Sequence, residues 1–157
     1  MKRNRKGSKQ RRQTIQVWTY DQARQVLPYV ESIMRSLRER QLEAQEHHLS
    51  ASRLAGTSGR ADRATLVARE ETLGAAQEAE ARVHEALEEL HTLDIYCLDP
   101  VQGLALIPFA QENQLAWYIF DLFDGEFLRY WRFHRDPLEM RRPIADVLPG
   151  PQDSVVI

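Results

Sequence analysis

Hydrophobic residues in the first half of the chain recur at steps of three and four, which places their side chains on one face of an α-helix. A first helix is predicted over residues 20–54. Thr19 and Gln22 are spaced as in a capping box at its start. Pro28 has no backbone donor and predicts a kink or a break. The apolar positions of this helix are Ala23, Val26, Leu27, Val30, Ile33, Met34 and Leu37.

A second helix is predicted over residues 62–93, after a loop with two glycines. Its apolar stripe alternates three- and four-residue steps, as in a coiled coil. Two long helices joined by a short loop favour an antiparallel hairpin. The distal part, around residues 45–70, has few large apolar groups, which favours an arm that projects or meets another chain. The stripe consists of Leu66, Leu73, Ala76, Val83, Leu87 and Leu90.

After residue 94 the pattern changes to short apolar and aromatic runs separated by turn residues, which is typical of a small antiparallel sheet. Pro108 predicts an edge or an end in the second run, because proline cannot donate to a ladder. Asp124-Gly125 predicts a type I′ turn before the last run. Strands are predicted over residues 95–98, 104–109, 115–122 and 127–134. Alternation in the last strand places Phe127, Arg129, Trp131 and Phe133 toward the core.

These elements predict an α+β fold, in which a long antiparallel helical hairpin carries a small antiparallel β-meander packed at its base. A length of 157 residues suits one domain, predicted over residues 15–145. We expect a disordered basic tail over residues 1–14 and a C-terminal tail over residues 146–157.

Several motifs of the chain point to a known family. They are WTYDQARQVLP near the start, then GLALIPF, LAW, and YW followed by RRPI. From Val17 to Ile144 the chain resembles the bacterial domain-of-unknown-function family 2203. The resemblance implies a compact prokaryotic domain with a helical hairpin and a sheet, and it implies no particular activity. The chain departs from the family pattern at three positions: Leu106 replaces an acid, Ala116 a cysteine and Arg132 a histidine.

Charge is unevenly distributed along the chain. The net charge is −2, but residues 1–13 carry +7 with no acid, so the remainder carries −9. The basic segment is a candidate polyanion-binding arm for RNA, DNA or the ribosome. The alternative is a solubilising extension. Its charged residues are Lys2, Arg3, Arg5, Lys6, Lys9, Arg11 and Arg12.

Two further residue groups are candidates for chemistry. His84, Glu88 and His91 share one helix face and form a candidate metal half-site, which Cys97 or His134 would complete. The alternative is a solvated helix face. In the last strand and after it, arginines alternate with aromatics and are candidates for binding an anionic ligand or nucleic acid. The alternative places the aromatics in the core and pairs the arginines with the acidic helices. This second group is Arg129, Trp131, Arg132, Arg141 and Arg142.

Other patterns limit the function classes. Cys97 is the single cysteine, so no intrachain disulfide can form, and a reducing, cytoplasmic compartment fits. This thiol is a candidate nucleophile or, as is commoner, a buried apolar group. No apolar run approaches the ~20 residues that span a bilayer. Neither a glycine-rich phosphate loop nor a nucleophile elbow occurs, and no cofactor is predicted.

Three functions therefore remain open from the sequence. The first is a non-enzymatic interaction or scaffold protein that acts through the hairpin and binds a protein partner or a second copy. The second is an RNA- or ribosome-associated factor that uses the basic tail and the arginine-rich strand. The third is a small metal- or ligand-binding domain of enzymatic kind.

Overall fold

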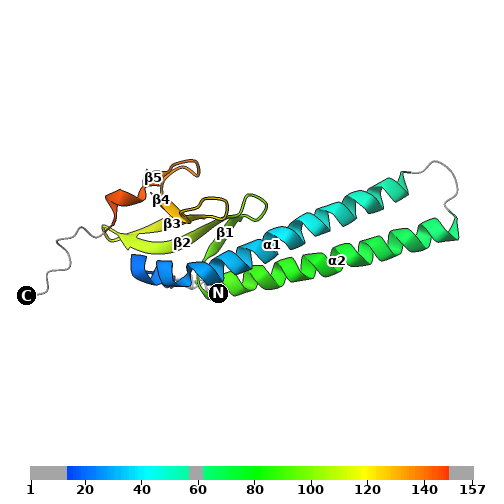
Figure 1. Ribbon diagram of the computed structural model, residues 1–157, viewed down its shortest axis with the longest axis horizontal. Coiled ribbons are helices and arrows are strands. Elements are labelled where there is room, and N and C mark those ends of the chain that lie inside the picture. Colours follow the sequence, from blue (N-terminus) through cyan, green and yellow to red (C-terminus); the bar gives the residue numbers. More distant parts are fainter. Residues whose placement is uncertain (1–13, 57–61, 149–157) are drawn as a thin grey trace, which may run out of the picture.

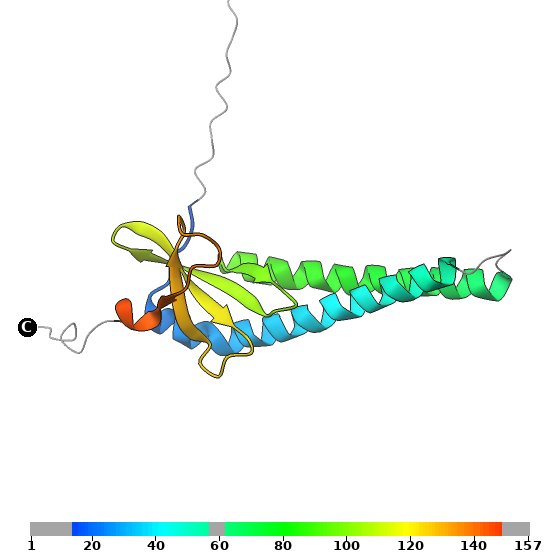
Figure 2. The same ribbon diagram turned by 90° about the horizontal axis from the view of Figure 1, so that it is seen from above.

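The computed structural model describes residues 14–56 and 62–148, which form one helical hairpin and one sheet (Figure 1). Helix α1 spans Tyr20–Ala55 and helix α2 spans Arg63–Thr92. Both views show that the two helices run side by side well beyond the sheet (Figure 2). Within the described residues, no helix is both long and apolar enough to cross a membrane. The predicted basic segment, residues 1–13, lies outside the described residues.

Local side-chain bonds set the helix starts. The Thr19 hydroxyl accepts from the Gln22 amide at 3.2 Å, and the Gln22 side chain accepts from the Thr19 amide at 3.1 Å, so the predicted capping box is confirmed. Asp62 caps α2 by accepting from the Thr65 amide at 2.8 Å. The helix continues through Pro28, so a break there is wrong, and a kink stays a prediction.

The sheet is an antiparallel meander that, in the described part of the chain, has five strands in the order β1-β2-β3-β4-β5. The predicted α+β fold with a helical hairpin and a β-meander is thus confirmed. The last strand is an addition, because two residues carry no alternation that a sequence pattern could reveal. The strands are β1 (Tyr96–Asp99), β2 (Leu104–Gln111), β3 (Gln114–Asp121), β4 (Leu128–Phe133) and β5 (Arg142–Pro143), followed by the short helix η1 (Ile144–Asp146).

The tight hairpin turn lies elsewhere than predicted. Glu112 and Asn113 both have positive φ, at 52° and 60°, and join β2 to β3 as a two-residue turn. Asp124 and Gly125 have no positive φ, so the predicted type I′ turn there is wrong. The β3–β4 connection is held by side-chain bonds instead, because the carboxylate of Asp124 accepts from the amide of Glu126 at 3.1 Å.

Pro108 lies within β2 and leaves its ladder with β3 intact. Its carbonyl accepts from the Trp18 amide at 2.8 Å, on the side of β2 away from β3. A residue in an antiparallel ladder directs its N–H and C=O to the same side, so the missing donor also faces away from β3. The segment before α1 thus contacts β2 beyond the reach of β1, and the edge predicted at Pro108 is present.

One face of the sheet packs on the hairpin, and we call it the helix face. Its side chains include Tyr118, Phe120 and Trp131, which join the core residues of the two helices. Burial of such aromatic and aliphatic side chains, worth about 1.5–3 kcal/mol each, is the main force that holds the sheet on the hairpin. The fully buried helix residues of this core include Val30, Met34, Leu37 and Leu90.

The seam between the helices changes character along its length. Away from the sheet it buries Ala44 and Ala51 of α1 against α2, which contributes Ala76 and Ala79. Leu66 was placed on the seam by its spacing, but it is 52% exposed, so that assignment is wrong. Small side chains let the two helices approach closely but bury little apolar area, so this part of the hairpin has the weaker core.

The opposite face of the sheet, which we call the open face, carries a second apolar cluster. Leu106, Trp117 and Ile119 are buried there, with Leu115 and Tyr130 packed against them. A bulge in the β3–β4 ladder, where Phe120 pairs with Leu128 and Ile119 with Tyr130, leaves Arg129 unpaired and exposed. The predicted core position of Arg129 is therefore wrong, and Leu128 joins the helix-face core instead.

Candidate ligand-binding groove

A groove with a volume of about 830 Å³ lies where the open face of the sheet meets the end of α2. That volume is in the range of sites that hold small organic molecules. Most of its wall is apolar or aromatic, and three of its side chains carry basic groups. The lining residues are Thr14, Ile15, His91, Asp94, Ile95, Tyr96, Leu98, Leu106, Leu115, Trp117, Arg132, His134 and Leu138.

Arg132 is the charged group buried in this wall. Its side chain is only 5% exposed, although a guanidinium stays protonated in any protein environment. Both of its hydrogen bonds start from Nη1, which donates at 2.8 Å to the carbonyl oxygens of Asp136 and Pro137. Its Nε is buried without any hydrogen-bond partner. The guanidinium therefore keeps unused donor capacity in a largely apolar wall.

Asp136, whose backbone carbonyl accepts from Arg132, has its carboxylate engaged by a different arginine. Asp136 accepts from Arg142 Nε at 2.8 Å and from Arg142 Nη2 at 3.0 Å, and it also accepts from the Phe133 amide at 2.8 Å. These bonds, first of all those from Arg142, lower the pKa of Asp136 to about 2. Within the described residues no carboxylate forms an ion pair with Arg132. The turn after β4 thus offers Arg132 two carbonyl dipoles but no counter-charge.

Aromatic rings form the middle and the rim of the groove. Trp117 pairs across the ladder with Arg132, and its indole N–H donates to His134 Nδ1 at 3.1 Å. That bond places the proton of the neutral His134 ring on Nε2. Tyr96 is 59% exposed, and its ring lies 5.5 Å from the His91 ring and 6.4 Å from the Trp117 ring. The groove thus combines a flat exposed ring with a buried cation.

The segment before α1 closes the groove at the end of α2. The Gln16 amide donates to Asp94 Oδ2 at 2.8 Å, and Trp18 Nε1 donates to the Leu93 carbonyl at 3.0 Å. Asp94 has a positive φ of 56°, which lets the chain turn from α2 into β1. It is the one acid among the lining residues, so basic side chains outnumber acidic ones in the groove.

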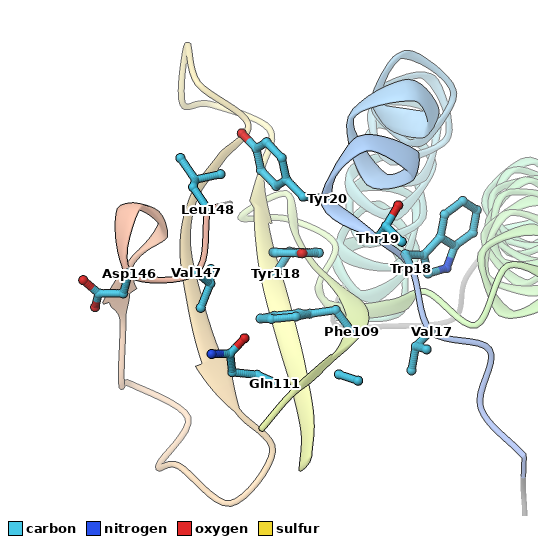
Figure 3. A pocket seen from close by; sticks show the side chains of 11 residues that line it. Val17, Trp18, Thr19, Tyr20, Phe109, Gln111, Tyr118, Asp146, Val147 and Leu148 are labelled. Carbon is cyan, nitrogen blue, oxygen red and sulfur yellow. The ribbon is translucent and has the colours of Figure 1, made fainter. Parts of the chain in front are cut away.

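A second cavity, of about 450 Å³, is lined by the segment before α1, by β2 and β3, and by residues of and after η1 (Figure 3). The rings of Phe109 and Tyr118 stack there with centroids 3.9 Å apart. Burial raises the pKa of Tyr118 to about 12, so its hydroxyl stays protonated. Figure 3 shows the Asp146 carboxylate pointing away from these rings. No buried charged group lines this cavity, so it is a weaker candidate for specific binding than the groove.

The structure divides the predicted arginine and aromatic group between two faces. Arg132 lines the groove, but Trp131 lies on the helix face and its indole N–H donates to the Pro143 carbonyl at 3.1 Å. Arg142 packs over the Trp131 ring at 5.5 Å, and the exposed Arg129 pairs with Asp124 at 3.1 Å. The arginines therefore pair within the sheet region rather than with the helices. Arg141 lies 6.0 Å from the ring centroid of Tyr130, on the open face.

The remaining candidates occupy separate places. His84 pairs with Glu88 at 3.1 Å in solvent, whereas His91 contacts Tyr96 at the groove. No three such side chains in the described residues lie close enough together to hold a metal, so this site stays a prediction. Burial raises the pKa of the Cys97 thiol to about 11, which disfavours the thiolate that a nucleophile requires.

Sequence reasoning missed the groove residues of the neighbouring strands, chiefly Tyr96, Leu106 and Trp117. A detectable signal was present in the almost wholly apolar third strand, which indicates burial on both faces. If one face covers the helices, alternation assigns Trp117 to the other, together with its cross-strand partner Arg132.

Comparisons with known proteins identify the family of the chain but no individual relative. Neither the curated proteins nor the solved structures include a significant match. Residues 16–144 match the model of the family described as uncharacterized conserved protein (DUF2203), and this range contains both helices and all the strands described above. The match covers most of the chain, so the protein belongs to the DUF2203 family.

Proposed function

We propose that this protein is a binding domain for a small organic anion, whose charged group pairs with Arg132 in the groove on the open face. The observation that carries the proposal is an arginine that is only 5% exposed, pairs with no carboxylate of the described residues and lines a groove of about 830 Å³. An isolated charge in a protein wall is costly unless an opposite charge pairs with it. A ligand that brings a carboxylate or a phosphate would supply that charge.

The rest of the wall supports an amphipathic ligand. Tyr96, Leu98, Leu106 and Trp117 provide apolar and aromatic surface beside the cation. Small-molecule sites commonly combine such a wall with a few convergent polar groups that fix the orientation of the ligand. An anionic group with an attached flat or apolar body therefore fits the groove better than a bare inorganic ion.

Titration calorimetry with three naphthalene probes tests the proposal. The probes are 1-naphthyl phosphate, 1-naphthoate and the neutral 1-naphthol, which share one ring system. Charge-assisted hydrogen bonds contribute about 1.5–3 kcal/mol, so we expect one or both anions to bind at least about tenfold more tightly than 1-naphthol. Arg132→Gln removes that preference.

Arg129→Gln is the matched control, because Arg129 lies on the same strand but is exposed and does not line the groove. This variant is expected to bind the probes as the unaltered protein does. Equal affinity for the three probes, or a preference for anions that survives Arg132→Gln, would refute the proposal. Circular dichroism of each variant checks that the fold is intact.

Self-association through the hairpin is a second candidate function. It is supported by three large apolar side chains that are exposed in the distal half of the hairpin, Leu49, Leu66 and Val67. Sedimentation velocity over a hundredfold concentration range tests it. A dimer that dissociates in the double variant Leu49→Ser with Leu66→Ser supports a second copy as the partner, and a monomer at every concentration contradicts it.

A further inference from the structure

We infer that the ligand of the groove is a nucleotide, whose phosphate pairs with Arg132 and whose base stacks on Tyr96. This inference rests on the proposed anion site and adds the class of ligand. Its starting point is that a buried cation and an exposed aromatic ring line the same groove.

The sheet register fixes the separation of these two groups. Arg132 of β4 pairs with Trp117 of β3, Trp117 pairs with Pro108 of β2, and β1, which carries Tyr96, follows β2. Neighbouring strands lie about 4.8 Å apart, so three strand spacings separate the two backbones by roughly 14 Å. A ligand that reaches both side chains must hold its anionic group and its ring at opposite ends, as a nucleoside monophosphate does.

The exposed ring of Tyr96 can stack on a flat heterocycle. The Tyr96 ring lies 5.5 Å from the His91 ring and 6.4 Å from the Trp117 ring and is still 59% exposed, so part of its surface stays available for stacking. Every nucleobase has a π-face, and stacking on an aromatic side chain contributes about 1–3 kcal/mol per base. An alkyl chain of the same length would not use this exposed ring.

Charge near the groove favours phosphate over carboxylate. Three basic side chains line the groove, those of His91, Arg132 and His134, against the single acid Asp94. A protonated His91 or His134 adds to the positive potential of Arg132. A doubly charged phosphate gains more from that potential than a singly charged carboxylate does.

The test compares AMP, adenosine and ribose 5-phosphate by titration calorimetry on the full chain. AMP is expected to bind most tightly. Tyr96→Leu should weaken AMP by roughly 5- to 100-fold, to the level of ribose 5-phosphate, whereas Arg132→Gln should bring AMP to the level of adenosine. Tyr29→Leu is the control, because Tyr29 is similarly exposed, at 51%, but lies on α1 outside the groove.

Three outcomes overturn the inference and are distinguishable. If 1-naphthyl phosphate binds through Arg132 while AMP binds no better than ribose 5-phosphate, the anion site stands and the nucleotide does not. If no probe binds through Arg132, both proposals fail. If a single-stranded oligoribonucleotide binds and is unaffected by Tyr96→Leu and Arg132→Gln, the basic segment acts alone and the groove is no nucleotide site.

Discussion

The arginines on the two faces of the sheet differ in their charge partners. Beside the helix face, Arg142 forms two hydrogen bonds with the Asp136 carboxylate and packs over Trp131 and Phe133. On the open face, Arg132 is buried and donates to two carbonyl oxygens, and no carboxylate in the described part of the chain pairs with it. The charge of Arg142 is paired within the chain, whereas the charge of Arg132 is left for a bound anion to pair. The difference separates a structural pair from a candidate binding group.

The largest loss of stability should come from a truncation on the helix face, which belongs to the larger of the two apolar clusters. Phe120 is fully buried there and stacks on Phe127, with centroids 5.3 Å apart. Phe120→Ala leaves a closed cavity and should destabilise the protein by about 3–5 kcal/mol in urea unfolding. A loss below about 1 kcal/mol would mean that this face is not the main core.

The open face should tolerate truncation better. Leu106 is 5% exposed but lines the groove, so Leu106→Ala enlarges an existing opening rather than creating a closed cavity. We expect a loss near the lower end of the range for such changes, about 2 kcal/mol, in the same unfolding experiment. A cost equal to that of Phe120→Ala would remove the distinction between the two faces.

The ion pair beside the helix face should show itself in the pH dependence of stability. Its bonds hold the pKa of Asp136 at about 2, below that of an unfolded aspartate near 3.9. The contribution of Asp136 is therefore fully present at neutral pH and is lost as pH falls from about 4 to about 2. Asp136→Asn should lower the stability at pH 7, and its difference from the unaltered protein should shrink over that interval. A difference that stays constant with pH would contradict this assignment.

The fold was predictable because periodic patterns carry it. The capping box at Thr19 and the regular spacing from Ala23 to Leu37 locate α1, and short apolar and aromatic runs between turn residues locate four strands. The misplaced turn has a physical cause, since Glu112-Asn113 reaches positive φ without a glycine while Asp124-Gly125 is held by side-chain bonds. Arg142-Pro143 is too short to show alternation.

The site was predictable only in part. Arg132 was among the candidates, but Arg129 and Trp131 were grouped with it, although adjacent residues on a strand face opposite sides. The bulge at Arg129 interrupts the alternation of side chains between the two faces of β4, and no sequence pattern predicts that bulge. The fold of the turn after β4 decides which arginine the Asp136 carboxylate binds. It binds Arg142, and Arg132 receives only the backbone carbonyl of Asp136, which the structure alone reveals.

The smallest expected effect on stability belongs to Arg132 itself. Replacing an uncompensated buried charge by an apolar side chain of similar length is often neutral or stabilising. Arg132→Met frees two carbonyl acceptors near the surface, which water can satisfy, so we expect the free energy of unfolding to change by no more than about 1 kcal/mol. Arg142→Met, which leaves the Asp136 carboxylate without its partner, should cost more, because there the pair is complete within the chain.

The most direct test is the free energy of unfolding of the unaltered protein and of Arg132→Met, each measured by urea denaturation with and without saturating 1-naphthyl phosphate. We predict equal stability without the ligand, and a ligand-induced gain in the unaltered protein alone. A loss of several kcal/mol in ligand-free Arg132→Met, or the same gain in both proteins, would show that Arg132 is a structural residue and not the anion site.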